Sequence, residues 1–300
     1  MPNIKKFLIL NCSLLSILFW SFFASAEGQR KALLIGINDY ARSAIPDLRG
    51  AVNDVNRLAD VLQTKMNFPE GNIIKLTDKQ ATRENILNTL SAFISKVNKD
   101  DIVYIHFSGH GSQATDLNGD EEDGYDETFL PHDARQKGIA DITDEEFKGL
   151  FSKLPTDNAL IVFDSCHSGT VTRSVEFSNR SVAPDDGSDG RDIAKLYKKT
   201  KSEIRSRAVV SVDSLGHVLM TSAPADKEAL DGPIGDNREF YGIFSFALVK
   251  ALEEHGPSGT PEQVHQSVKK TLAGMEKRYG FKAPEPQLEI HSDKLNRALF

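Results

Sequence analysis

One cysteine and one histidine, each set among small residues, are the side chains of this sequence best suited to chemistry. Cys166 lies in the stretch DSCHSG and His110 in the stretch HFSGHG. A cysteine attacks as its thiolate, so a catalytic cysteine needs a base nearby. The flanking Gly and Ser residues leave room for a substrate backbone and for N–H groups that face a developing oxyanion. The pair therefore predicts thiol catalysis with Cys166 as nucleophile and His110 as base.

Each residue also has a plainer interpretation. A single cysteine is often a small buried hydrophobic residue, and a single histidine can be structural. Two other histidines compete as the base. His106 falls inside an expected strand, and His167 adjoins the nucleophile, where neighbours on an extended chain point to opposite sides. We therefore favour His110.

The elements around these residues alternate between strand and helix. Short apolar runs predict strands, and apolar residues at helical spacing predict helices. The expected strands are 31–37, 73–76, 102–107 and 159–163, and the expected helices are 51–62, 82–97 and 143–154. Such alternation indicates an α/β protein with a parallel sheet, whose functional sites lie at the carboxyl ends of the strands. His110 and Cys166 each follow such an end, so they are expected to meet at one edge of the sheet.

The pattern changes after Cys166. Residues 170–210 are polar and are expected to form an exposed, mobile loop. This loop carries nine basic residues, among them Arg173, Arg180, Arg191, Lys198, Lys199, Arg205 and Arg207. Beyond it we expect a strand at 218–222, helices at 244–254 and 261–279, and a last strand near 286–290.

Composition limits the function. The chain has 300 residues, of which 39% are hydrophobic and 26% charged, as in ordinary soluble globular proteins. Its net charge of −7, without a basic stripe, argues against nucleic-acid binding.

The first 26 residues read as a secretory signal peptide. Lys5 and Lys6 precede an apolar run, and Ala24-Ser25-Ala26 is a small-x-small cleavage site. The alternative is an uncleaved membrane anchor, but the run is shorter than the ~20 apolar residues that a spanning helix needs. We expect a secreted or periplasmic protein without membrane attachment after cleavage. Cys12 would leave with the signal, so Cys166 would be the only thiol.

The motifs together resemble those of metacaspase-like peptidases, within the caspase-like clan. They are IGIND (35–39), LRGAVND (48–54), HFSGHG, DGYDETFLPHD (123–133), DITDEE (141–146), DSCHSG and PEPQL (284–288). The likeness is to a secreted, bacterial-type member of the family. It implies a caspase-like fold, with a mostly parallel six-stranded sheet flanked by helices on both faces. It further implies a large-subunit-like part (27–170), a mobile linker loop (171–210) and a small-subunit-like part (211–300).

The resemblance also implies roles for single residues. His110 would be general base and acid, Cys166 the nucleophile that forms a thioester, and the N–H groups of Gly111 and Cys166 the oxyanion donors. Asp54 and Asp164, with Ser108 nearby, would bind the Arg or Lys that precedes the scissile bond. An acid pair of this kind should favour a cation and reject an aspartate. The alternative for Asp54 is a solvated helix face.

Calcium is the one cofactor that the resemblance raises, as an activator. The matching acids are Asp123 or Asp126, Asp144 and Glu145, but Arg173 stands where the family's calcium-dependent members have an aspartate. The alternative is a solvated acidic loop. The chemistry itself should need no cofactor.

The sequence thus predicts a cysteine endopeptidase for polypeptides with Arg or Lys before the scissile bond. Such an enzyme could cleave itself in its basic loop, and we expect it to be a monomer. Two alternatives stay open: a caspase-fold peptidase of another specificity, and a catalytically silent caspase-fold interaction module.

Overall fold

A six-stranded sheet forms the centre of the fold. The computed structural model describes residues 28–115, 124–167, 177–185, 217–224, 227–234, 238–283 and 285–300. The strand order is β12-β9-β7-β3-β1-β2. The strands are β1 (Arg30–Gly36), β2 (Ile73–Thr77), β3 (Ile102–Ser108), β7 (Ala159–Asp164), β9 (Val218–Thr221) and β12 (Gln287–Glu289). Only β12 runs antiparallel to its neighbour, so this is the mostly parallel six-stranded sheet that the motifs predict.

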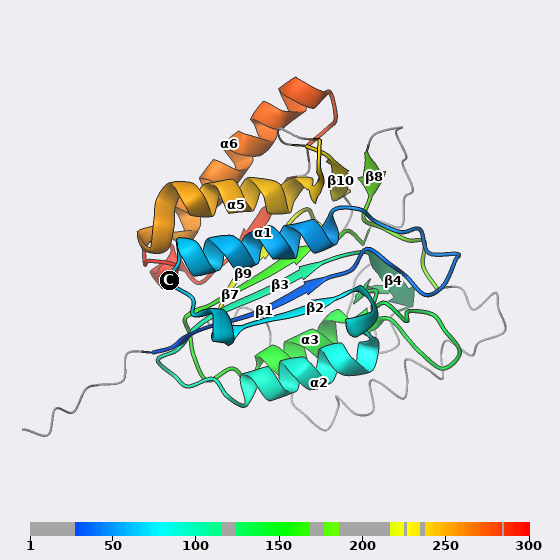
Figure 1. The fold of residues 1–300 in the computed structure, drawn as a ribbon, viewed down its shortest axis with the longest axis horizontal. Helices are drawn as coiled ribbons and strands as arrows, with labels where there is room; N and C mark the ends of the chain where they lie inside the picture. Colours follow the sequence, from blue (N-terminus) through cyan, green and yellow to red (C-terminus); the bar gives the residue numbers. More distant parts are fainter. Residues whose placement is uncertain are drawn as a thin grey trace, which may run out of the picture.

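Helices cover both faces of this sheet (Figure 1). Helices α1 (Ala51–Thr64), α5 (Ile243–His255) and α6 (Pro261–Tyr279) lie on one face, and α2 (Arg83–Ile94) and α3 (Asp144–Phe151) on the other. Successive strand residues alternate between the two cores, because strand side chains point to opposite faces. Leu34 of β1 packs with the core under α1 and α5, whereas Leu33 packs with the core under α2. The predicted α/β architecture, with helices on both faces of the sheet, is therefore confirmed.

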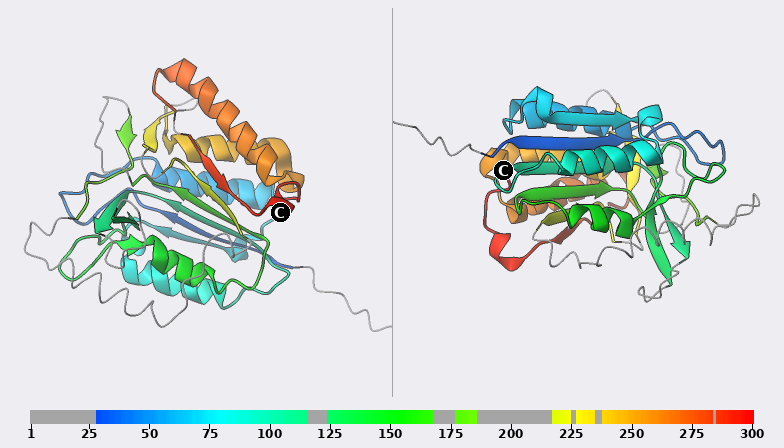
Figure 2. Two further views of the ribbon diagram at one scale, coloured as in Figure 1. Left: turned by 180° about the vertical axis from the view of Figure 1, so that it is seen from behind. Right: turned by 90° about the horizontal axis from the view of Figure 1, so that it is seen from below.

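Two small antiparallel sheets lie beyond the carboxyl ends of the central strands. One has the order β4-β5-β6, from β4 (Gly111–Thr115), β5 (Tyr125–Phe129) and β6 (Ile142–Thr143). The other has the order β11-β10-β8, from β8 (Ser178–Asn179), β10 (Leu230–Pro233) and β11 (Phe240–Gly242). Figure 2 shows β4 at the end of the central sheet, where β3 and β7 also finish.

The described part of the loop after Cys166 differs from the sequence-based expectation. Residues 170–210 were expected to be exposed, yet Phe177 and 179–182 are buried. The polar composition suggested a loop in contact with solvent. Instead, the backbone groups of these residues form hydrogen bonds, and their charged side chain forms ion pairs, with partners far away in the sequence. The rest of that loop, Asp123 and residues 1–26 lie outside the described residues. Among the helices that are described, none has the length and apolar character to span a membrane.

Candidate active site

The ends of two neighbouring strands bring His110 and Cys166 to one place. Strands β3 and β7 pair in parallel, with Ser108 opposite Asp164. His110 and Cys166 each lie two residues beyond that pair. The parallel register therefore carries both side chains past the same edge of the sheet, where parallel sheets place their ligands.

His110 is held in an orientation suited to a general base. Its Nε2 donates a hydrogen bond to the carbonyl of Pro46 at 2.8 Å, and its Nδ1 is buried without a hydrogen-bond partner among the described residues. The Pro46 bond places the ring proton on Nε2 and leaves a lone pair on Nδ1. The backbone N–H of His110 donates to the Tyr40 hydroxyl at 2.7 Å, which fixes the loop. Burial lowers the pKa of His110 to about 4, so the ring is neutral at pH 7.

The thiol of Cys166 is neutral as well. The residue is 1% exposed, and its Sγ lies 3.6 Å from the Ala229 carbonyl. Burial raises the pKa of Cys166 to about 12. A neutral thiol that relies on a neutral imidazole must transfer its proton as it attacks, so these protonation states suit base-assisted thiol attack rather than a resting ion pair.

Two backbone N–H groups converge on a single carbonyl oxygen. The oxygen of Arg180 accepts from the N–H of Gly111 at 2.9 Å and from the N–H of Cys166 at 3.3 Å. The Gly111 distance lies within the range of about 2.7–3.1 Å found in oxyanion holes, and the Cys166 distance is slightly longer. Gly111 must lack a side chain, because a Cβ there would overlap the Cys166 carbonyl. The Arg180 carbonyl thus occupies the position of a carbonyl under attack.

The side chain of Arg180 fills a pocket of acids. Its Nη2 donates to Asp54 at 2.7 Å and to Asp231 at 2.9 Å, and its Nη1 lies 3.1 Å from Asp164 Oδ2. Nη1 also donates to the Ser108 hydroxyl at 2.5 Å. The guanidinium and all three carboxylates are buried. The structure therefore brings Asp54, Asp164 and Ser108 around one cation, and it adds Asp231, which sequence reasoning missed.

The pocket carries an excess of negative charge. Burial raises the pKa of Asp54 to about 7, although the Arg180 guanidinium opposes that rise. Burial likewise raises the pKa of Asp231. Burial disfavours the charged form of Arg180, yet Asp164, Asp54 and Asp231 together hold its pKa well above the usual value. Three buried carboxylates this close together require a cation between them.

The backbone and a helix end position the acids. The Asp164 carboxylate accepts from the N–H and the hydroxyl of Ser245, in the first turn of α5, at 3.1 and 2.6 Å. A helix N-terminus stabilises a carboxylate there. The Asp54 carboxylate accepts from the N–H of Gly242 at 2.9 Å. Because Asp54 lies on the buried face of α1, the alternative of a solvated helix face is excluded.

The chain on either side of Arg180 runs like a bound peptide. Before it, Asn179 and Ser178 of β8 pair antiparallel with Leu230 and Asp231 of β10, and the Arg180 N–H donates to the Ala229 carbonyl at 3.0 Å. After it, the N–H of Val182 donates to the Gly111 carbonyl at 3.0 Å. Main-chain pairing of this kind is a common way to hold an extended peptide.

The other two histidines are engaged elsewhere. His106 Nε2 lies 3.2 Å from the Ser245 hydroxyl, and burial lowers its pKa to about 3. His167 Nδ1 lies 3.1 Å from the carbonyls of Ser112 and Thr128. Both rings are buried in hydrogen-bonded positions, so they offer less to a substrate than His110 does.

Three of the candidate calcium ligands lie within the described residues. Asp126 lies in β5, and Asp144 and Glu145 begin α3. Asp144 pairs with Lys148 at 2.5 Å, and burial, with Glu145 nearby, raises its pKa to about 8. Among the described residues there is no group of three or more metal-binding side chains. Asp123 lies outside the described residues, so calcium binding stays an expectation.

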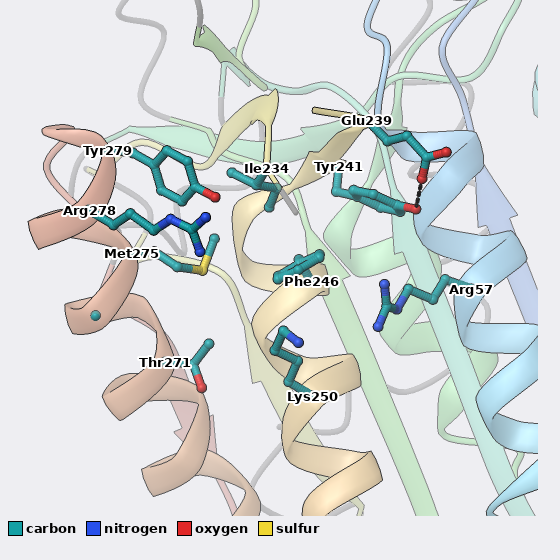
Figure 3. Close-up of a pocket in the computed structure, with 11 residues that line it drawn as sticks. Arg57, Ile234, Glu239, Tyr241, Phe246, Lys250, Thr271, Met275, Arg278 and Tyr279 are labelled. Carbon is teal, nitrogen blue, oxygen red and sulfur yellow. Dashed lines mark hydrogen bonds between the residues drawn. The ribbon is translucent and has the colours of Figure 1, made fainter. Parts of the chain in front are cut away.

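Two of the cavities outside the acid pocket differ in their linings. One, of about 320 Å³, is largely lined by apolar side chains and reaches Ser165 and His167 on either side of Cys166. The other, of about 440 Å³, lies between α1, α5 and α6 and has three cationic side chains in its wall (Figure 3): Arg57, Lys250 and Arg278. Neither His110 nor Cys166 lines this second cavity.

Comparisons with known proteins agree with this geometry. Residues 30–174 match the family model described as "Metacaspase, peptidase C14 domain". The chain is 31% identical to Metacaspase-1B of Aspergillus terreus over 285 residues, which cover 84% of this chain and 74% of that one. It is 38% identical to Metacaspase-1 of Botryotinia fuckeliana over 156 residues, 50% of this chain but only 36% of that one. The crystal structure of caspase-1 from Spodoptera frugiperda has the same fold, with a TM-score of 0.57, 12% identity and coverage of 91% and 89% of the two chains.

Proposed function

Because this chain belongs to the metacaspase family of cysteine peptidases, we propose that it is an endopeptidase that cleaves polypeptides after Arg or Lys. One observation carries the specificity. Arg180 places its carbonyl oxygen on the N–H groups of Gly111 and Cys166, while its guanidinium is enclosed by three carboxylates. A substrate residue bound in the same way would present its own carbonyl to the thiol.

The reaction follows from the groups at this place. His110 Nδ1 takes the thiol proton as Cys166 Sγ attacks the carbonyl carbon, and the two N–H groups stabilise the oxyanion. The C–N bond breaks, the amine leaves with the proton from His110, and a thioester remains on Cys166. Water, deprotonated by His110, then hydrolyses the thioester and restores the thiol. Nucleophile, base and oxyanion donors are all protein groups, so we propose no cofactor for the chemistry.

The first experiment compares three matched fluorogenic peptides that end in Arg, Lys or Asp. We expect turnover of the basic peptides only, and none by a Cys166→Ala variant. Turnover of the Asp peptide alone would keep the thiol mechanism and reject the acid pocket. A folded protein that turns over none of the peptides would favour the silent interaction module. Arms with calcium and with a chelator test activation by that ion.

Self-processing is the second part of the proposal. Among the basic residues of the 170–210 loop, Arg180 is the one in the acid pocket within the described residues, so the bond to be cut is Arg180–Ser181. Incubated wild-type protein should yield a fragment that begins at Ser181, detected by N-terminal sequencing. Arg180→Gln should abolish this cut, whereas Arg191→Gln, in the same loop, should leave it. A fragment that begins at another residue would contradict the assignment.

The location of the enzyme is a separate proposal. The basic, apolar and small-x-small pattern of residues 1–26 supports export to the periplasm or medium. Mass analysis of protein recovered from a secreting host should give an N-terminus at Glu27. An intact N-terminus in the membrane fraction would instead support an anchor.

A further inference from the structure

The residues after Arg180 contact a second binding site, on the leaving-group side of the bond. The hydroxyl of Ser112 lies 2.8 Å from the Val182 carbonyl and 3.1 Å from the Ala183 carbonyl, as their donor. Nη1 of Arg135 donates to the same Ala183 carbonyl at 2.7 Å. Both carbonyls belong to the second and third residues after the Arg180–Ser181 bond. No side chain of the bound segment takes part in these contacts.

The groups that make these contacts are themselves fixed. Nη2 of Arg135 donates to the Ser112 hydroxyl at 2.7 Å, so that hydroxyl has its own proton left for the carbonyls. Nη2 also pairs with Asp141 at 2.9 Å, and Nε donates to the same carboxylate at 3.2 Å. Asp141 in turn accepts from the hydroxyl of Thr128 at 3.3 Å. Ser112, Arg135 and Asp141 are all buried.

The backbone at Arg135 carries a further sign of function. Its φ is 58°, in the left-handed region that a non-glycine residue seldom adopts. Such backbone strain is concentrated at functional sites. Here it accompanies a guanidinium that joins a carboxylate to a peptide carbonyl. An ion pair that served stability alone would need neither the strained backbone nor the contact with the 181–183 segment.

We propose that Ser112 and Arg135 form a primed-side subsite, which binds the main-chain carbonyls of the second and third residues after the scissile bond. Asp141 is a positioning residue that orients the Arg135 guanidinium. The ligand is an extended polypeptide of any sequence on that side, because only its backbone is contacted. This inference rests on the proposed function, since it takes residues 180–183 as a guide to how a substrate lies.

The test compares two substrates with the same residues up to a terminal Arg. One carries an aminocoumarin as leaving group, and the other is an internally quenched peptide with four residues after the Arg. The measured quantity is the ratio of their kcat/KM values for each full-length variant. This ratio does not depend on how much of a preparation is folded or self-processed.

We expect Ser112→Ala and Arg135→Lys each to lower the ratio about tenfold, because each loses a buried hydrogen bond to the peptide carbonyls. Arg83→Lys is the matched control, because Arg83 begins α2 and pairs with Glu146 of α3 at 2.7 Å. Its ratio should equal that of the wild type. A ratio unchanged in both test variants, or an equal loss on both substrates, would overturn the subsite. Failure of the wild type on both substrates would instead overturn the proposed function.

Discussion

Two sets of acids differ in what the fold does with them. Asp54, Asp164 and Asp231 come from three distant segments and surround one guanidinium. Asp144 and Glu145 begin one helix, and Asp144 pairs with Lys148, one turn along the same helix. Burial raises acid pKa values in both sets, so burial alone does not define a binding site. A binding site is defined instead by acids from distant segments that converge on one ligand position.

The largest difference in kcat/KM is expected when one acid of each set is replaced. Asp54→Asn should lower kcat/KM for an Arg peptide about 100-fold or more, because a broken buried ion pair costs about 3–5 kcal/mol. Asp144→Asn is the matched control. Thermal melting of both variants would show whether they are folded. A folded Asp54→Asn enzyme with turnover within threefold of wild type would mean that the acids do not bind the substrate cation.

Filling the pocket should have the next largest effect. A Cβ at Gly242 would overlap the Asp164 carboxylate and the Arg180 guanidinium. Gly242→Ala should therefore raise KM for an Arg peptide about 10- to 100-fold, from an overpacking cost of about 1–3 kcal/mol. Gly274→Ala on α6 is the control, since open space surrounds a Cβ there. Equal KM values for the two variants would contradict the assigned pocket.

The pH dependence of kcat/KM should distinguish titration of Asp54 in the acid pocket from titration of the base His110. With a pKa of about 7, Asp54 becomes protonated as the pH falls and loses its attraction for the substrate cation. His110, with a pKa of about 4, stays neutral over the same range. We expect kcat/KM for an Arg peptide to be about tenfold lower at pH 6 than at pH 8. A profile that is flat down to pH 5 would show that Asp54 does not titrate in this range.

The smallest effect on kcat/KM is expected for the second set of acids, Asp144 and Glu145. Asp144→Asn, or addition of a chelator to wild type, should change kcat/KM by about twofold or less, because the pair with the partly exposed Lys148 contributes little. A calcium-dependent increase that Asp144→Asn removes would reverse this expectation. It would show that these acids bind the ion together with residues outside the described ranges.

Much of the framework could be predicted from local pattern. The strands before His110 and Cys166 are buried apolar runs, and their parallel pairing explains why the two residues meet. The acids at 54 and 164 lie in recognisable motifs. These features are encoded within a few neighbouring residues, which is why single-sequence reasoning can identify them.

The missed features depend on partners far apart in the chain. Strands β8, β10 and β11 have two to four residues each, too few to show a period, and they exist because they pair with each other. Asp231 joins the pocket through that pairing. The ring of His110 is oriented by a backbone carbonyl, that of Pro46, which any residue would supply. Arg180 lies in a polar stretch, and only its three distant acids distinguish it from the other basic residues of the loop.

The carbonyl of Arg180 lies on the N–H groups of Gly111 and Cys166 of its own chain, so the self-processing proposed above would be a first-order reaction. A tethered segment already seated on the oxyanion donors reacts without an encounter between molecules. Its half-time would therefore be the same in dilute and concentrated protein. The delay before full activity would then be a property of each single molecule. The rate constant of self-processing would depend on the geometry of residues 177–183 and not on the concentration of enzyme.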